Sequence, residues 1–373
     1  MSAAGKHSQP YPWEQRKLGE IFNERKEKSE NSNEQLLSVT INDGVVKSDT
    51  LDRKSNASKD RSNYKIVNPS DIAYNSMRMW QGALGVSSYH GIVSPAYTVI
   101  SVRNVGKDNP YFYKYSFKRS KSLNVFRKHS QGLTPDTWNL KYPLFKQIKY
   151  QVPLLIEQEK IGQLFQSLDK TITLHEEKYR QLERLKKALL QKMFADETGY
   201  PALRFKGFTE KWEHHKFKDV LKTHSFRQYL AEPQDNGNFE VIQQGDTPII
   251  GYANGKPFTN YKEITLFGDH TLSLYKPIGP FFVATDGVKI LSADGFDGQY
   301  LFATLERYKP KPQGYKRHFT ILKNQNMWFT RGNYEQKKIG EFFTNFDTLI
   351  TLHQHKIDNL KCLKRALLQK MFV

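Results

Sequence analysis

Two stretches of 38 residues decide how this chain is organised. Residues 157–194 read EQEKIGQLFQSLDKTITLHEEKYRQLERLKKALLQKMF, and residues 335–372 read EQKKIGEFFTNFDTLITLHQHKIDNLKCLKRALLQKMF. They align without a gap at an offset of 178 residues, and 22 of the 38 positions are identical. Because chance does not produce such agreement, the chain is interpreted as a duplicated half. Two copies so far apart do not form a solenoid, whose repeats stack on their neighbours.

Each copy is predicted to form one long helix with an apolar seam. Steps of three and four residues return to the same face of a helix, and sustained steps of this kind are typical of a coiled coil. Thirty-eight helical residues span about 57 Å. The predicted seam comprises Ile161, Phe165, Leu168, Ile172, His175, Leu182 and Leu189 in the first copy, and Ile339, Phe343, Phe346, Ile350, His353, Leu360 and Leu367 in the second.

Both seams are interrupted at the same two positions, by a histidine (His175 and His353) and by a lysine (Lys186 and Lys364). One interpretation is that the two rings meet in an antiparallel helix pair and fix its register. The other is that both are half-exposed residues at the edge of the seam. A metal site from two histidines alone is not expected.

A globular domain is predicted before each helix. Residues 13–18 (WEQRKL) resemble residues 212–217 (WEHHKF), so each half begins at a tryptophan and ends in its helix. The expected boundaries are residues 1–152 for the first domain, 153–194 for the central helix, 195–333 for the second domain and 334–373 for the C-terminal helix. Runs rich in β-branched and aromatic residues, 91–102 and 281–291, predict strands, and the fold class is α+β.

The charge balance indicates a polyanionic partner. Lys and Arg number 57 against 38 Asp and Glu, which gives a net charge of +19. A balance this basic is typical of nucleic-acid binding. Residues 114–129 and 307–323 each contain six Lys or Arg and no acid, and residues 126–129 (FRKH) parallel 315–318 (YKRH). A solvated basic face is the alternative, but recurrence in two divergent domains favours DNA-facing loops.

The candidate DNA-binding residues follow from these runs and from neighbouring polar loops. Arginine and lysine neutralise phosphates, and arginine also reaches guanine edges. The candidates are Arg78, Gln81, Ser88, Tyr89, Arg127, Lys128 and His129 in the first domain, and His270, Tyr275, Lys276, Lys316, Arg317 and His318 in the second.

No catalytic or metal site is predicted. The single cysteine, Cys362, excludes a disulfide framework and a cysteine-based zinc site. Residues 108–111 (DNPY) come near an adenine-methyltransferase motif but lack its second proline, and no phosphate-binding loop occurs. Residues 1–12 are polar, and no apolar run reaches 18 residues, so we expect a cytoplasmic protein without a membrane span.

The sequence resembles the specificity (S) subunits of type I restriction–modification enzymes over essentially its full length. The repeated helices and residues 152–158 (VPLLIEQ) carry the resemblance most specifically. Residues 13–22 and 201–208 look like the starts of two target-recognition domains, and 71–97, 242–250 and 267–277 look like parts of their bodies. The second helix departs from the pattern, because TRGNY at 330–334 replaces the proline-containing start.

The resemblance implies a non-catalytic DNA-binding subunit. Two target-recognition domains, separated by two long helices that form an antiparallel intramolecular coiled coil with pseudo-twofold halves, would each read one half of a bipartite double-stranded site. The helices would set the half-site spacing and dock two methyltransferase subunits that methylate adenine N6. Two motor–nuclease subunits would complete the complex. No cofactor is expected on this chain; S-adenosylmethionine, ATP and Mg²⁺ are expected on the partners.

Two other classes stay open from the residues alone. A restriction enzyme with divergent catalytic residues would methylate or cleave DNA without partners. A coiled-coil scaffold, with basic charge that serves only solubility, would bind DNA without sequence preference or not at all. The DNA target itself cannot be derived from this sequence.

Overall fold

A computed structural model of the chain describes residues 13–29, 33–51, 60–314 and 316–372. The first twelve residues of the predicted first domain, Tyr315 and Val373 lie outside these ranges. Two compact units emerge: residues 1–174 with 357–373, and residues 175–356. Each unit therefore holds one globular domain and parts of both long helices. Along the described residues, none of the helices combines the length and apolar character that crossing a membrane requires.

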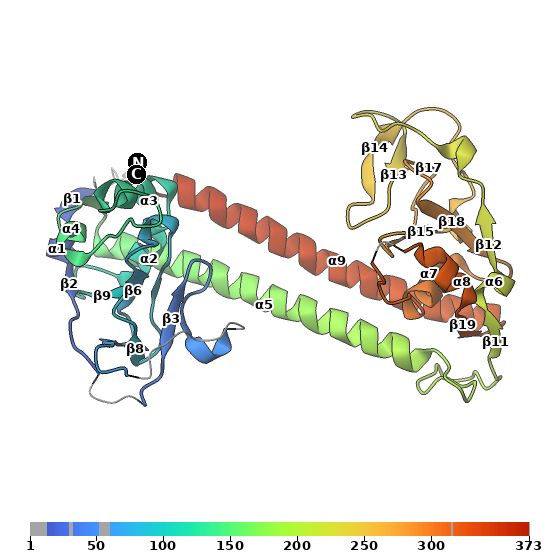
Figure 1. Ribbon diagram of the computed structural model, residues 1–373, viewed down its shortest axis with the longest axis horizontal. Coiled ribbons are helices and arrows are strands. Elements are labelled where there is room, and N and C mark those ends of the chain that lie inside the picture. Colours follow the sequence, from blue (N-terminus) through green and yellow to red (C-terminus); the bar gives the residue numbers. More distant parts are fainter. Residues whose placement is uncertain (1–12, 30–32, 52–59, 315, 373) are drawn as a thin grey trace, which may run out of the picture. The chain divides into compact units, whose positions relative to one another are not determined.

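The first unit is built on a four-stranded antiparallel sheet in the order β2-β9-β6-β7. The strand β1, labelled in Figure 1, pairs antiparallel with β10, and this pairing brings the two ends of the domain together. Its elements are β1 (Glu14–Lys17), α1 (Leu18–Ile21), β2 (Phe22–Glu24), β3 (Leu37–Thr40), β4 (Gly44–Lys47), η1 (Ser48–Thr50), β5 (Lys65–Val67), β6 (Ile72–Asn75), η2 (Met79–Gln81), β7 (Leu84–Val86), β8 (Gly91–Val93), β9 (Tyr97–Val102), α2 (Pro110–Phe117), α3 (Ser120–His129), α4 (Tyr142–Phe145) and β10 (Lys149–Val152).

The second unit repeats this plan with a different sequence. Its four-stranded sheet has the order β12-β18-β15-β16, again antiparallel throughout, and β11 pairs with β19 as β1 does with β10. Its elements are β11 (Glu213–Lys216), α6 (Phe217–Val220), β12 (Leu221–His224), η3 (Arg227–Tyr229), β13 (Phe239–Ile242), β14 (Ile249–Ala253), η4 (Tyr261–Glu263), β15 (Thr265–Gly268), β16 (Leu274–Tyr275), β17 (Phe281–Val283), β18 (Val288–Ala293), α7 (Gly298–Arg307), α8 (His318–Asn324) and β19 (Asn326–Phe329).

The predicted α+β fold class is therefore confirmed. The two segments that were predicted to form strands do contain strands. Residues 91–102 form β8 and β9, and residues 281–291 fall in β17 and β18. The two repeated stretches form α5 (Leu155–Met193) and α9 (Asn333–Lys370). The missing proline does not prevent α9 from starting at the predicted place, because the first turn of a helix needs no proline.

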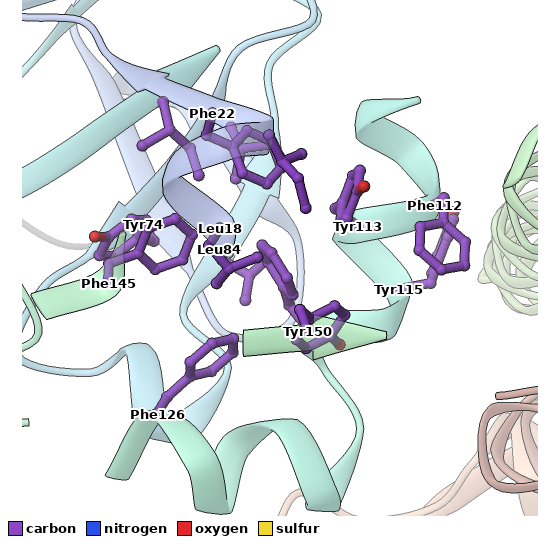
Figure 2. Close-up of a cluster of buried hydrophobic side chains, with 14 of the residues drawn as sticks. Leu18, Phe22, Tyr74, Leu84, Phe112, Tyr113, Tyr115, Phe126, Phe145 and Tyr150 are labelled. Carbon is purple, nitrogen blue, oxygen red and sulfur yellow. The ribbon is translucent and has the colours of Figure 1, made fainter. Parts of the chain in front are cut away.

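Aromatic side chains fill the core of the first domain, as Figure 2 shows. Phe22, Tyr74, Phe126 and Phe145 are fully buried between the sheet and the helices. Short polar caps start the helices that pack on the sheet. Asn109 accepts the N–H of Tyr111 at the start of α2, and Asp297 caps α7 in the same way.

Both long helices enter the core of each unit, but with opposite ends. In the first unit, Phe165 near the start of α5 stacks with Phe372, which follows α9, at a ring distance of 5.9 Å. In the second unit, Phe194, directly after α5, contacts Phe343 near the start of α9 at 6.4 Å. Phe165 corresponds to Phe343 and Phe194 to Phe372 at the repeat offset. The same aromatic contact is thus made twice.

Candidate nucleic-acid interface

In the first domain, the fold brings two of the predicted regions together. Helix α3 packs against η2, so Arg127 of α3 and Arg78, the residue before η2, lie on neighbouring elements. Both arginines are exposed. Arg127 lies 5.9 Å from the ring of Trp138, and Trp138 contacts Trp80 edge-on at 5.2 Å. We call Arg78, Trp80, Arg127 and Trp138 the α3–η2 patch.

The α3–η2 patch has the composition that suits contact with DNA. Arg127 donates to Asn124 of its own helix through Nε and a terminal nitrogen, and its side chain is exposed. Gln81 at the edge of the patch has a buried Oε1 that accepts no hydrogen bond from the described residues. Guanidinium groups held against indole rings are pre-oriented, which lowers the entropic cost of binding.

Residues 126–129 correct one interpretation drawn from the sequence. They form the last turn of α3 instead of a loop, and Phe126 is a buried core residue. The corresponding run in the second domain precedes and begins α8, so the two runs are not structural equivalents. Lys128 and His129 are exposed, and the His129 ring bonds to the Val125 carbonyl oxygen through Nδ1 at 2.9 Å.

Ser88 and Tyr89 lie apart from the patch-forming helix, in the turn between β7 and β8. Both are exposed, and the Lys47 ammonium of β4 lies 5.4 Å from the Tyr89 ring. The turn therefore carries its own cation and aromatic ring, at a second place on the first domain.

The second domain contains a hollow of about 270 Å³ beside the start of α8. Three basic side chains line it, Arg317, Lys289 of β18 and His224 of β12, over the rings of Phe226 and Phe319. Asp269 also lines it, but its Oδ1 accepts the Phe319 N–H at 2.9 Å and its Oδ2 lies 3.7 Å from Lys289. The Arg317 side chain is exposed. The hollow therefore presents net positive charge and apolar faces, which suits a nucleotide.

His224 is the titratable ring of this hollow. Its Nε2 lies 2.8 Å from the Ser292 hydroxyl, and its ring meets Phe258 edge-on. Burial, with a smaller effect of Lys222, lowers the pKa of His224 below its usual value. The ring is therefore mainly neutral near pH 7 and acts as a hydrogen-bonding group rather than a fixed charge.

His318 was predicted to face DNA, but the structure places it in the interior. It is 1% exposed. Its N–H and its Nδ1 both lie within hydrogen-bond distance of the Asp269 carbonyl oxygen, at 2.8 and 3.1 Å, and its Nε2 accepts the Gln313 N–H. The ring thus holds the loop before α8 in place and is out of reach of a ligand on the surface.

Tyr275 and Lys276 are also engaged inside the domain. The Tyr275 hydroxyl donates to Glu240, and burial together with this carboxylate raises the pKa of Tyr275 to about 12. The Lys276 ammonium donates to the carbonyl oxygens of Lys262 and Ile264, and burial lowers its pKa to about 8. His270 and Lys316 are exposed, and the Lys316 ammonium donates to Gln313 Oε1 at 3.3 Å.

Sequence reasoning did not select Trp80, Trp138, His224 or Lys289. Trp80 and Trp138 are far apart in the sequence and meet only because α3 and the loop after it fold over η2. His224 and Lys289 lie on strands whose pairing could not be derived from single-sequence patterns. The only sequence signal available was Lys289 in the predicted strand run 281–291.

The predicted seam residues are all buried or half-buried on α5 and α9. His175 and His353 meet in the second unit, with their Nδ1 atoms 3.0 Å apart and their ring centres 5.1 Å apart. One ring must donate and the other accept in such a contact. Their role in fixing helix register stays a prediction. Within the described ranges, no group of three or more His, Cys, Asp or Glu is placed to hold a metal ion.

Comparison with protein families decides what the first half is. Residues 10–184 match the family described as the type I restriction modification DNA specificity domain. This stretch is just under half of the chain and is similar to that family. The likeness seen in the sequence is thereby confirmed. Specificity subunits are non-catalytic components of their restriction–modification complexes. No curated protein matches the sequence of this chain.

Solved structures extend the fold of the specificity domain to the whole chain. The chain is similar to the type I restriction–modification S subunit from M. genitalium, with a TM-score of 0.69 and 13% identity over 99% of this chain and 98% of that one. It is also similar to a chain from a study of complex assembly and conformational transition in the type I R-M system, with a TM-score of 0.50 and 15% identity over 98% of both chains. At such identities the likeness concerns the fold.

Proposed function

We propose that this chain is the specificity subunit of a type I restriction–modification complex and reads a bipartite site in double-stranded DNA. The observation that carries the proposal is the second sheet, whose strand order β12-β18-β15-β16 repeats β2-β9-β6-β7. The first of these two folds lies within the stretch that matches the DNA specificity family. A second copy of the fold supports a second DNA-reading domain, one for each half of the site.

In this proposal each domain uses a different local surface. The α3–η2 patch and the Ser88–Tyr89 turn would contact the first half-site, with Gln81, Lys128 and His129 beside them. Arg317 and Lys289 at the hollow, with Lys316 and His270, would contact the second. Arginine to guanine contacts supply base discrimination, while lysine contacts to phosphate supply affinity without sequence preference.

The two long helices would pair as an antiparallel coiled coil that sets the spacing of the half-sites. Two contacts support the antiparallel direction: the start of α5 with the end of α9 in the first unit, and the end of α5 with the start of α9 in the second. A seam that is buried or half-buried throughout supports the pairing along the helices.

The same helices would dock two methyltransferase subunits. Leu174 of α5 is 64% exposed and Leu352, its counterpart on α9, is 65% exposed. Leu185 and Leu363 form a second exposed pair at the repeat offset. Large apolar side chains left open at equivalent places suit two copies of one partner. The partners would bind S-adenosylmethionine and methylate adenine N6, and two motor–nuclease subunits would use ATP and Mg²⁺ for restriction. This chain would bind no cofactor.

The test is to co-express the chain with its methyltransferase subunit and to map methylated adenines across a genome. We expect a split motif with a fixed spacer. Arg78→Ala with Arg127→Ala should relax only one half of the motif, and Arg317→Ala only the other, each at about 1–3 kcal/mol of discrimination per lost base contact. Lys121→Ala, exposed on the opposite end of α3, is the control.

Other outcomes would replace the proposal. A continuous motif contradicts two-domain reading. Methylation or cleavage by the purified chain alone would make it an enzyme, and binding without sequence preference in the complex would make it a scaffold. For the docking surface, Leu174→Glu with Leu352→Glu should abolish co-purification of the methyltransferase, whereas Lys178→Glu, exposed one turn from Leu174, should not.

A further inference from the structure

A buried glutamine stands at the second position of each 38-residue repeat, Gln158 in α5 and Gln336 in α9. Both are 0% exposed, which is unusual for an amide side chain. A buried amide must satisfy its donors and acceptor within the protein. The partners of these two side chains therefore reveal what they hold.

The two glutamines make the same three bonds in two domains of different sequence. Gln158 Oε1 accepts the Asn109 N–H at 2.9 Å, and its Nε2 donates to the carbonyl oxygens of Lys107 at 3.1 Å and Pro153 at 2.9 Å. Asn109 is the N-cap of α2. Each bond goes to the backbone, so it does not depend on the side chains of the domain.

In the second unit, Gln336 Oε1 accepts the Asp297 N–H at 2.7 Å, and its Nε2 donates to Gly295 at 3.0 Å and Thr330 at 2.7 Å. Asp297 is the N-cap of α7, and Gly295 lies two residues before it, as Lys107 lies two residues before Asn109. One amide thus ties the cap of a domain helix to the start of a long helix in both units.

A glycine one turn further along each helix completes the contact. A Cβ at Gly162 would lie 3.3 Å from the Tyr111 Cβ and 3.4 Å from the Phe112 nitrogen. A Cβ at Gly340 would lie 2.7 Å from the Tyr300 nitrogen. Residues four apart share a helix face, so glutamine and glycine meet the same end of α2 or α7. At Gly340 a Cβ would clash with the backbone, so that contact requires glycine, whereas at Gly162 a Cβ would fit only if its neighbours moved by a few tenths of an ångström.

We infer that Gln158 with Gly162, and Gln336 with Gly340, are positioning residues that fix the orientation of each recognition domain on its long helix. Three bonds from one rigid amide to two backbone segments oppose rotation of the domain about the contact, which a purely apolar contact permits. The inference rests on the proposed function in one respect: orientation of a domain is what aims its DNA-reading surface at its half-site.

The first experiment needs no DNA. In a Cys362→Ser background, spin labels on Ser167→Cys of α5 and on Asp136→Cys, both exposed in the first unit, report the distance between α5 and the domain in the full chain. We expect one narrow distance distribution in the parent and in Gln163→Leu, an exposed control on α5. Gln158→Leu should broaden it. An unchanged distribution would overturn the inference. Gly162→Ala tests the same contact if Gln158→Leu does not fold.

The second experiment uses the complex with its methyltransferase and a DNA library that varies each half-site and the spacer. Gln158→Leu should lower discrimination about tenfold in the half read by the first domain only, and Gln336→Leu in the other half only. If the variants lose methylation activity but keep the same sequence discrimination in both half-sites, the glutamines only stabilise the fold and do not orient the domains. If Gln158→Leu broadens the distance distribution but the parent complex shows no bipartite motif, the inference about domain orientation stands and the proposed function is rejected.

Discussion

Asp169 and Lys186 hold the helices to their domains with opposite charge in the two units. In the first unit, Asp169 of α5 lies between Lys364 of α9 and Lys114 of α2, and it accepts the Tyr115 hydroxyl at 2.8 Å. In the second unit, Lys186 of α5 lies 2.5 Å from both Asp347 of α9 and Glu306 of α7.

The comparison separates what was duplicated from what was not. Lys364 corresponds to Lys186 and Asp347 to Asp169 at the repeat offset, so the pair between the helices is the same in both units. The third member comes from the domain and differs: a lysine in the first, a glutamate in the second. The Asp–Lys pair between the two helices is therefore common to both units. The residue that each domain adds to this pair differs in charge between the units.

The largest effect is expected for Lys186→Met. Lys186 is 6% exposed, and its loss leaves the half-buried carboxylates of Glu306 and Asp347, which are 28% and 38% exposed, without their cation. Removal of one partner from a fully buried ion pair costs about 3–5 kcal/mol. Because solvent screens these two carboxylates in part, we expect the lower end of that range, about 3 kcal/mol. Urea denaturation followed by circular dichroism should show this loss in Lys186→Met, and no comparable loss in the exposed neighbour Lys187→Met.

The deficit of Lys186→Met should also depend on pH. Burial raises the pKa of Glu306, and Lys186 opposes this effect. A raised carboxyl pKa means that the contribution of Glu306 to stability falls as pH rises through the window above its ordinary value. Without Lys186 the pKa of Glu306 rises further, so the deficit should be larger at pH 7 than at pH 5. An equal deficit at both values would contradict this reading of the cluster.

A second comparison concerns the glutamate that begins each repeat. Glu335 accepts two bonds from Arg204, at 2.7 and 2.9 Å, whereas Glu157 accepts one bond from the Trp13 indole at 3.2 Å. Arg204→Met should cost about 3 kcal/mol because it strands a buried carboxylate. Trp13→Phe removes a single hydrogen bond from the uncharged indole to the half-buried Glu157 carboxylate and should cost less, about 1.5 kcal/mol.

Arg204→Lys provides the control for this pair. It retains the charge but loses the two-pronged geometry, so its unfolding free energy should fall between the parent and Arg204→Met. Equal stability of Arg204→Met and the parent would mean that the Glu335 contact contributes nothing.

The smallest effects are expected from two half-buried lysines, one in each domain. Burial lowers the pKa of Lys118 and of Lys276 to about 8. The folded chain then binds fewer protons than the unfolded chain above pH 8, so each lysine adds stability as pH rises from about 8 toward its ordinary value of 10.5. Lys118→Met and Lys276→Met should flatten the rise in unfolding free energy between pH 8 and 10. Lys121→Met, exposed on α3, should leave it unchanged.

The repeat made the helices predictable, because apolar spacing over 38 residues depends only on the period of a helix. The repeat also identified the two matched histidines. It did not predict the hydrogen bonds of Gln158, because their partners lie in a loop of the domain. The DNA-facing residues were harder to predict. A run of basic residues does not reveal which of its members is buried. His318 is buried because it bonds to Asp269, which follows a strand far away in the sequence. Trp80 and Trp138 meet only in the folded domain.

The pairing of β1 with β10, and of β11 with β19, closes each domain at its own base. Glu14 lies opposite Val152, and Glu213 opposite Phe329, although the chain between the partners is longer in the first domain. Residues that are added or removed between the two paired strands change the size of the domain. They do not change the point at which the long helix begins. Each domain can therefore vary in length while the phase of its helix stays constant.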